Sequence, residues 1–311
     1  MSTSGKVISL NVSTEVGTIK TPVPQATFDD RGIVGDAHAG TWHRQISMLG
    51  QETIDEFVAA TSRPTKPGEF AENITTRGIG LETAAILDRF RIGAVELELT
   101  QIGKKCHGDN CAIYQEVGNC VMPKQGVFFR VVSPGTAAPG DAIEHIPRPL
   151  RVRTITLSDR ASAGEYEDRS GPRARQILAE FFAPRRWHEQ IDGLLIPDDA
   201  ERLRAELTAA VDDGLDVVFT LGGTGVGPRD ITPEVVEGVC RKTLPGIMDH
   251  IRLKFAADNP AALLSRSVTG VAGTTQIYAL PGSVRAVEEY LAEILVTLEH
   301  IIGTLHSLDT H

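Results

Sequence analysis

The sequence predicts two domains of different class: a mostly β, barrel-like domain over residues 1–146 and a three-layer α/β domain with a parallel sheet over residues 151–311. Three observations lead to this prediction. The first part has short alternating strand signals between turn glycines, which is typical of barrels. The second part alternates strands with amphipathic helices, which favours a parallel sheet. Between them, residues 147–150 contain Pro147 and Pro149, a stiff segment that suits a linker.

The composition excludes several classes of protein. A formal net charge of −10 argues against a broad basic surface, so we expect no nucleic-acid partner. No apolar run approaches membrane-spanning length, and the residues after Met1 lack the apolar core of a signal peptide. Three of the four cysteines are bunched at positions 106, 111 and 120, which is unlike a disulfide framework. We therefore expect a cytoplasmic protein with no membrane partner.

The elements of the first domain follow from local patterns. Gln51 to Ala60 is predicted to be a short amphipathic helix. His38 and His43 lack the spacing of a zinc-binding pair, so we expect them to be hydrogen-bonding loop residues. Alternating apolar residues predict strands at 7–10, 90–92, 95–99 and 127–132.

Cys106 is the candidate reactive residue of the first domain. Lys104 and Lys105 precede it and would favour its thiolate, the nucleophilic and sulfur-carrying form. The three bunched cysteines and His107 could instead bind zinc, although no C-x-x-C pair is present. Inert buried thiols are the third interpretation. The residues alone leave these three alternatives open.

The first domain resembles a MOSC domain, the module that forms the C-terminal part of molybdenum-cofactor sulfurases. The resemblance implies that this domain binds molybdenum cofactor or molybdenum ions, or carries sulfur on Cys106. The family's cysteine usually follows a proline, whereas Cys106 follows Lys105. The matching segments are Gly35-Asp36-Ala37-His38, the run from Gly68 to Ile74, Arg91-Ile92-Gly93, Cys106 and Gly140-Asp141.

The second domain is organised around an apolar strand, 217–221, that ends in a glycine-rich turn. Thr232 is expected to be the N-cap of the next helix and Pro233 its first residue. A strand, a glycine turn and a helix N-terminus together present backbone N–H groups to an anion. The turn lacks the Gly-Lys-Ser/Thr ending of a P-loop and the dinucleotide-binding glycine spacing. The sequence therefore predicts another kind of phosphate site, or a tight turn without a ligand.

The remaining elements alternate strand and helix. Strands are predicted at 152–157 and 194–196, and helices after Pro172, around Leu203 and after Ser283. The last helix carries an apolar stripe that is expected to contact the core or another subunit. The strand ends carry polar residues that should meet at one edge of the sheet. These residues are Ser158, Asp159, Asp198, Asp230 and Ser283.

Two of these polar residues also have a purely structural interpretation. Asp198 could be a helix N-cap that forms a capping box with Glu201. Ser283 could cap the last helix.

Residues 151–305 resemble the MogA/MoaB-type molybdopterin adenylyltransferases. The resemblance implies Mg²⁺-dependent transfer of AMP from ATP to the terminal phosphate of molybdopterin, with Asp198 and Asp230 at the two acidic positions on which the family relies. It also implies a homotrimer and a molybdenum-insertion enzyme as a partner. The matching segments are 158–164, 166–172, 196–198, 222–225 with 229–234, 264–266 and 280–283.

The residues of the second domain suit this chemistry. A phosphate monoester nucleophile is already ionised, so the protein has to align two anions and neutralise charge. Asp198 and Asp230 are the candidate catalytic and Mg²⁺-binding residues, and Arg266 is a further candidate phosphate clamp. Candidates for substrate and phosphate binding are Ser158, Asp159, Arg160, Gly222, Gly223, Thr224, Gly225, Arg229, Thr232, Pro281, Gly282 and Ser283.

Two other functions remain open at this point. One is a non-catalytic carrier that binds and shields molybdopterin or molybdenum cofactor. The other is a sulfurtransferase that acts through the MOSC domain.

Overall fold

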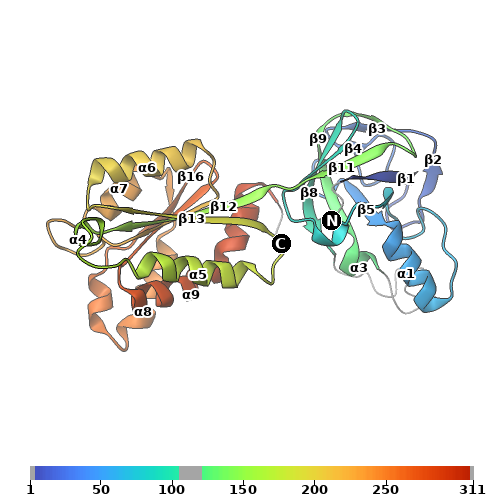
Figure 1. Cartoon of the computed structure of the whole chain (residues 1–311). Coiled ribbons are helices and arrows are strands. Elements are labelled where there is room, and N and C mark those ends of the chain that lie inside the picture. The colour runs from blue at the N-terminus through green and yellow to red at the C-terminus, as the bar shows by residue number, and fades with distance from the viewer. Residues whose placement is uncertain (1–3, 105–120, 309–311) are drawn as a thin grey trace. The chain divides into compact units, whose positions relative to one another are not determined.

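The computed structural model describes residues 4–104 and 121–308, which form two compact units (Figure 1). The N-terminal unit contains the chain up to Arg148 together with Arg186–His188. The C-terminal unit contains Pro149–Arg185 and the chain from Glu189 onward. Within the described residues, no helix has both the length and the apolar character that a bilayer span requires.

The N-terminal unit is built mainly of strands. Its main sheet consists of β1 (Ser4–Val12), β2 (Thr21–Val23), β5 (Ile46–Gly50), β6 (Ile74–Arg77), β7 (Arg89–Ile92), β8 (Val95–Ile102), β9 (Val127–Ser133) and β11 (Ala142–Ile146). A smaller sheet consists of β3 (Ala26–Asp29), β4 (Gly32–Ile33) and β10 (Gly135–Ala137). The short helices are α1 (Gln51–Thr61), η1 (Leu81–Thr83) and α3 (Met122–Gln125).

Seven strands of the main sheet close into a barrel. They follow the order β11, β7, β8, β9, β5, β6 and β1, and β1 pairs with β11 to complete the ring. Neighbouring strands in this ring are antiparallel except for the parallel pair β5 and β6, and closure leaves the seven strands without a free edge. The interior is apolar, and Phe90 and Phe129 meet edge to face there with ring centroids 5.1 Å apart. The predicted mostly β, barrel-like class is therefore confirmed.

The C-terminal unit contains a six-stranded sheet in the order β13, β12, β14, β17, β16, β15. Its strands are β12 (Pro149–Leu157), β13 (His188–Ile196), β14 (Val217–Leu221), β15 (Lys242–Thr243), β16 (Thr269–Ala272) and β17 (Thr275–Leu280). Its helices are α4 (Asp159–Ser162), α5 (Ser170–Phe182), α6 (Ala200–Asp212), α7 (Thr232–Val239), α8 (Pro245–Ala256), η3 (Pro260–Leu264) and α9 (Val284–Leu305).

The centre of this sheet is parallel, as predicted, but one edge is not. Strands β12, β14 and β17 run parallel, whereas β16 is antiparallel to β17 and β15 is antiparallel to β16. The reason is local: Ala272 pairs with Thr275, and Gly273 between them has a φ of +59°. A two-residue connection of this kind can only join antiparallel neighbours.

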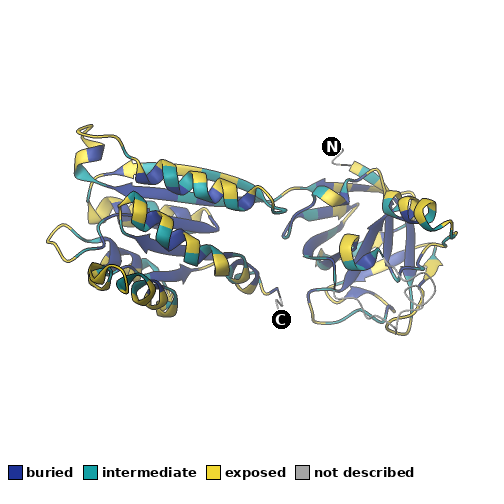
Figure 2. Cartoon of the chain, turned by 90° about the horizontal axis from the view of Figure 1, so that it is seen from below, coloured by how far each residue is buried: buried dark blue, intermediate teal, exposed yellow. Residues whose placement is uncertain are grey.

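Helices cover both faces of the sheet, which gives the predicted three layers. Figure 1 shows α6 and α7 on one face and α5, α8 and α9 on the other. All five residues of β14 are buried, as a central strand requires. Figure 2 shows buried strands beneath helices whose outer faces are exposed. Most of the predicted stripe on α9 is buried within this unit, namely Val287, Tyr290, Leu291, Ile294, Leu298 and Ile302.

Candidate functional site

The glycine turn after β14 can only be built from glycine at two positions. Gly222 and Gly223 have φ values of +114° and +64°, which L side chains rarely adopt. A Cβ at Gly222 would lie 2.6 Å from the carbonyl oxygen of Leu157, and one at Gly223 would lie 2.5 Å from Oγ1 of Thr232. The turn therefore lies close against the end of β12 and the start of α7.

Thr232 stabilises this turn in a way that differs from the sequence prediction. It is the first residue of α7, and the N-cap position belongs to Ile231 without a side-chain capping bond. Oγ1 of Thr232 instead donates a hydrogen bond to the carbonyl of Gly222 at 2.8 Å. The predicted N-cap is wrong because the hydroxyl reaches back to the turn rather than forward to the free N–H groups of the helix.

Asp230 and Arg266 hold the far side of the turn. Oδ2 of Asp230 accepts a hydrogen bond from the N–H of Gly227 at 2.7 Å. Arg266 donates to the carbonyls of Gly225 and Asp230, each at 2.6 Å, and its third nitrogen pairs with Glu234. Arg266 is thus committed to the loop, and its guanidinium fixes the shape of the turn.

The second acidic candidate, Asp198, lies at the end of β13 and pairs with Asp159 at the end of β12. The N–H of Asp159 donates to Oδ2 of Asp198, and the N–H of Asp198 donates to Oδ1 of Asp159, both at 3.0 Å. Arg229 forms an ion pair with the remaining oxygen of Asp159. This exchange joins the two strand ends and leaves Oδ1 of Asp198 without a hydrogen bond among the described residues.

The alternative interpretation of Asp198 as a helix cap is wrong. The N-cap of α6 is the next residue, Asp199, whose side chain accepts the N–H of Arg202 at 2.7 Å. The capping interpretation of Ser283 is confirmed, because Ser283 is the N-cap of α9 and accepts the N–H of Ala286 at 3.2 Å. Asp198 therefore caps no helix, and its Oδ1 atom is available for other contacts.

The candidates near α4 contact one another. Ser158 caps α4 through the N–H of Ala161 at 3.2 Å and shares a hydrogen bond with the Tyr166 hydroxyl at 2.8 Å. Arg160 pairs with Glu165 at 3.0 Å, and its guanidinium lies 5.2 Å from the centre of the Tyr166 ring.

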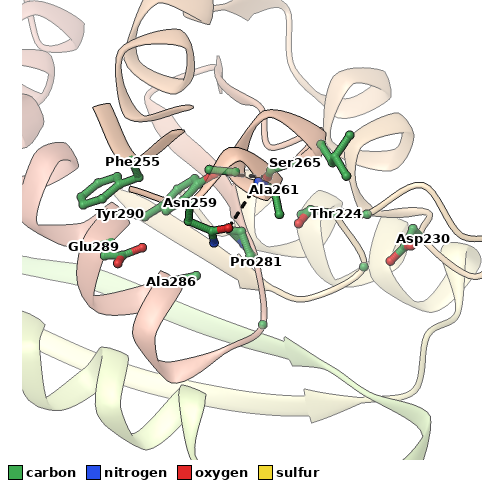
Figure 3. Close-up of a pocket in the computed structure, with 15 residues that line it drawn as sticks. Thr224, Asp230, Phe255, Asn259, Ala261, Ser265, Pro281, Ala286, Glu289 and Tyr290 are labelled. Atoms are coloured by element: carbon green, nitrogen blue, oxygen red, sulfur yellow. Dashed lines mark hydrogen bonds between the residues drawn. The ribbon is translucent and has the colours of Figure 1, made fainter. Parts of the chain in front are cut away.

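A pocket of about 360 Å³ lies beside the glycine turn (Figure 3). This volume is within the usual range for small-molecule sites. Six predicted site residues line it: Gly223, Thr224, Gly225, Asp230, Pro281 and Gly282. The other predicted residues of this unit are not among the lining residues, namely Ser158, Asp159, Arg160, Asp198, Gly222, Arg229, Thr232, Arg266 and Ser283.

Several lining residues were missed by the sequence predictions. Phe255 comes from α8, Asn259 precedes η3, and Glu289 and Tyr290 come from α9 (Figure 3). The Tyr290 hydroxyl lies 3.2 Å from Oγ of Ser265, so its ring is in the core while its polar end reaches the pocket wall. The apolar stripe of α9 indicated Tyr290 only as a core residue. Asn259-Pro260 is a cap signal that could have indicated η3.

The N-terminal unit has a pocket of its own, of about 410 Å³. Two of the segments that carry the MOSC resemblance contribute to it: Ala37 and His38 from the segment 35–38, and Ala71 and Asn73 from the segment 68–74. Lys104 also lines it, two residues before Cys106. Cys106, Cys111 and Cys120 lie outside the described residues.

Basic and aromatic side chains define the chemistry of this pocket. The Arg44 guanidinium lies 4.8 Å from the centre of the Trp42 ring, which is stacked with the His38 ring. Beneath them the buried Lys20 pairs with Asp36 at 2.5 Å. Burial alone would raise the pKa of Asp36, but hydrogen bonds from His38 and Lys20 hold that pKa well below its usual range. The Lys20 charge is therefore compensated, and Arg44 and Lys104 remain the basic groups of the lining.

Comparison with known proteins covers both halves of the chain. A family model described as a probable molybdopterin binding domain matches residues 153–300, and a MOSC domain model matches residues 35–144. The solved structure of a molybdopterin biosynthesis protein from Mycobacterium abscessus is 34% identical in sequence, with a TM-score of 0.46. The match covers 51% of this chain and 97% of the solved chain.

Two curated relatives match the C-terminal half. The molybdenum cofactor synthesis protein cinnamon of Drosophila melanogaster is 37% identical over 149 residues, which are 48% of this chain and 24% of that protein. The molybdopterin adenylyltransferase of Helicobacter pylori strain J99 is 33% identical over 158 residues, which are 50% of this chain and 88% of that protein. Since nearly the whole bacterial protein is matched at this identity, the chain belongs to the molybdopterin adenylyltransferase family of nucleotidyltransferases and carries a MOSC domain ahead of the family's own domain.

Proposed function

We propose that the C-terminal unit transfers AMP from ATP to the terminal phosphate of molybdopterin with the help of Mg²⁺. Family membership supports the reaction class. The observation that carries the proposal is the pocket that the glycine turn, Asp230 and the Pro281–Gly282 turn line together. This pocket joins the backbone of the glycine turn, whose N–H groups suit phosphates, to apolar side chains that suit a flat ring.

The chain's own groups suit phosphoryl chemistry in which positioning matters more than proton transfer. The accepting phosphate is already an anion, so it needs alignment with the α-phosphorus of ATP and compensation of negative charge. The carbonyls of Gly223 and Gly225 accept hydrogen bonds from the N–H of Thr232 and from Arg266, which orients the backbone of this turn before phosphate binds.

The acidic residues fit a Mg²⁺ ion. Mg²⁺ prefers one or two carboxylates together with substrate phosphates. Oδ1 of Asp198 and Oδ1 of Asp230 accept no hydrogen bond within the described chain, so both are available as hard oxygen ligands. When bound, Mg²⁺ would neutralise charge on the transferring phosphates.

The test is to incubate the whole chain with molybdopterin, ATP and Mg²⁺ and to detect adenylylated molybdopterin and pyrophosphate by mass spectrometry. We expect both products in equal amounts, and we expect EDTA to stop their formation. If the protein binds molybdopterin but forms neither product, a non-catalytic carrier is the correct function.

We propose that the N-terminal unit binds molybdenum cofactor or a related anionic pterin in its own pocket. The pocket has room for a pterin, and Arg44 and Lys104 suit an anionic group such as the pterin phosphate. The sulfurtransferase alternative requires in addition that Cys106 be reactive, which a labelling experiment tests directly.

Cys106 is expected to alkylate faster than Cys240 near neutral pH. Lys104 and Lys105 favour the Cys106 thiolate, whereas burial, aided by the charge of Glu237, raises the pKa of Cys240 to about 11. Limited labelling with iodoacetamide followed by peptide mass spectrometry gives the two rates. Equal or slower labelling of Cys106 would indicate an inert thiol and remove the sulfur-carrier role.

We also expect a homotrimer formed through the C-terminal unit. Leu253 on α8 and Val296 on α9 are apolar, yet 70% and 79% exposed in the single chain. Such side chains suit a subunit contact. Sedimentation equilibrium should give three times the chain mass at micromolar protein, and a monomer at that concentration would contradict the expectation.

A further inference from the structure

Three side chains with metal-binding donors converge in the N-terminal unit, away from the residues that line its pocket. Asp88 lies directly before β7, His145 lies on β11, and His188 belongs to the segment Arg186–His188 of the same unit. One ligand atom from each residue lies within 4.8 Å of the other two. The sequence predictions did not include any of the three, because they are separated by 57 and 43 residues along the chain.

Both histidines are directed at the same carboxylate oxygen. Nε2 of His145 lies 2.6 Å from Oδ2 of Asp88, and Nε2 of His188 lies 2.9 Å from it. The Asp88 side chain is fully buried and that of His145 is 7% exposed, whereas that of His188 is 31% exposed. The cluster of three side chains is therefore buried at Asp88 and His145 and is accessible to solvent at His188.

The orientation of these ligands is fixed by other groups. Oδ2 of Asp88 accepts the N–H of Ala85 at 2.7 Å, and Oδ1 accepts the N–H of Arg148 at 2.8 Å. The ring of His145 is stacked on Phe90, with centroids 4.6 Å apart and planes 15° from parallel. Supporting contacts of this kind orient the ligands of metal sites and hold them ready for the ion.

The buried carboxylate of Asp88 is surrounded by polar groups. It accepts the N–H groups of Ala85 and Arg148, and both imidazoles lie within 3 Å of its Oδ2 atom. Arg186 is close enough to act on this charge, yet it donates to the carbonyls of Leu81 and Ala84 at 2.5 and 2.7 Å. The printed hydrogen bonds of Arg186 therefore go to these two carbonyls, whereas both imidazoles are directed at the Asp88 carboxylate.

We propose that Asp88, His145 and His188 form a binding site for a divalent transition-metal ion, with Zn²⁺ as the ion that fits best. Two imidazole nitrogens and one carboxylate oxygen form a common zinc ligand set with an open fourth position. Tetrahedral zinc ligands lie about 3.3 Å from one another, given metal–ligand distances of about 2.0–2.2 Å. Each of the two observed contacts, at 2.6 and 2.9 Å, would have to lengthen by less than about 1 Å for both nitrogens and the carboxylate oxygen to bind one ion.

The alternative is a metal-free cluster in which the two imidazoles only donate hydrogen bonds to Asp88. That arrangement would need both Nε2 atoms protonated, whereas metal binding needs both Nε2 atoms free of protons. Metal titration distinguishes the two arrangements.

The experiment is calorimetric titration of the whole, EDTA-dialysed chain with Zn²⁺. Cys106, Cys111 and Cys120 are replaced with Ser in every sample, because thiolates also bind zinc. We expect one site with a dissociation constant in the micromolar range or lower. His188→Gln and His145→Gln should each weaken binding about a hundredfold or more, since loss of a supporting group alone already costs about 10- to 100-fold.

His250→Gln is the matched control. His250 also contacts a carboxylate, Oε2 of Glu293 at 2.9 Å, but the described residues place no second histidine there. Its replacement should leave Zn²⁺ affinity unchanged. His188 is partly exposed, so His188→Gln is expected to fold, which circular dichroism verifies.

Two results would overturn the proposal. One is a folded parent chain that takes up no Zn²⁺ at micromolar concentrations. The other is a His188→Gln variant that binds Zn²⁺ as tightly as the parent. A rise in melting temperature with added Zn²⁺ in the parent, absent in His188→Gln, would add independent support, because a ligand that binds only the native state stabilises it.

Discussion

Asp198→Asn and Asp230→Asn are each expected to slow AMP transfer about a hundredfold or more, the scale of losing one charge contact in a transition state. In the proposed reaction each change removes a carboxylate charge that would act on the transferring phosphates, and it keeps the size of the side chain. Asn can still accept the N–H of Asp159 at position 198 and the N–H of Gly227 at position 230. The fold and the binding of molybdopterin should therefore survive.

The chain offers a matched control for this experiment in the next residue. Asp199 is the N-cap of α6, and Asn caps helices about as well as Asp. Asp199→Asn removes the same charge one position further along and should transfer AMP at the parent rate. Initial rates at saturating ATP, together with circular dichroism, compare the three variants. A folded Asp198→Asn or Asp230→Asn protein with the parent rate would refute the role proposed for that carboxylate.

Gly222→Ala is expected to reduce the stability of the C-terminal unit by about 2–4 kcal/mol, from backbone strain and a steric clash together. The φ of +114° at Gly222 is unfavourable for any L side chain. The added Cβ would also lie 2.6 Å from the Leu157 carbonyl, which is backbone and cannot rotate away. The glycine turn would have to move from the end of β12, so AMP transfer should fall as well.

Gly246→Ala is the control for this change. Gly246 lies in α8, and no atom outside its own helix lies within 4 Å of a Cβ added there. This substitution should be neutral or stabilise by about 0.5–1 kcal/mol, because Ala loses less backbone entropy in a helix. Urea unfolding should be followed by far-UV circular dichroism, since Trp42 and Trp187 both belong to the N-terminal unit. Equal midpoints for parent and Gly222→Ala would contradict the expected strain.

The sequence was most informative about elements whose structure depends on residues that are adjacent along the chain. The run from Val217 to Leu221 predicted a buried strand, and β14 has the same bounds. Gln51 to Ala60 predicted a helix, and α1 spans Gln51–Thr61. Apolar periodicity and turn glycines are local properties, so these elements could be read without tertiary information.

Helix α8 shows where local patterns fail. Its apolar residues lie on several sides, and Met248 and Ile251 are buried while Leu253 is 70% exposed. Because the apolar residues form no single stripe, this segment has no helical periodicity from which a helix could be predicted. The pocket residue Phe255 was missed for this reason.

The partners of the polar side chains depend on the tertiary structure. Asp198 meets Asp159, 39 residues away, because β12 and β13 are neighbours in the sheet. The neighbouring Asp199 takes the capping role that the spacing to Glu201 had suggested for Asp198.

What the sequence by itself determined is the class of each domain, the order of most elements and the motifs that carry the family resemblance. These properties follow from side-chain periodicity and from backbone freedom at glycine and proline. Only the tertiary structure decided which hydrogen bonds Thr232 and Arg266 make, and which residues line the pocket beside Asp230. Only the tertiary structure brought His145 and His188 to Asp88. The physical reason is that a polar group bonds to whichever partner the packed chain brings within about 3 Å, and sequence spacing does not encode that distance.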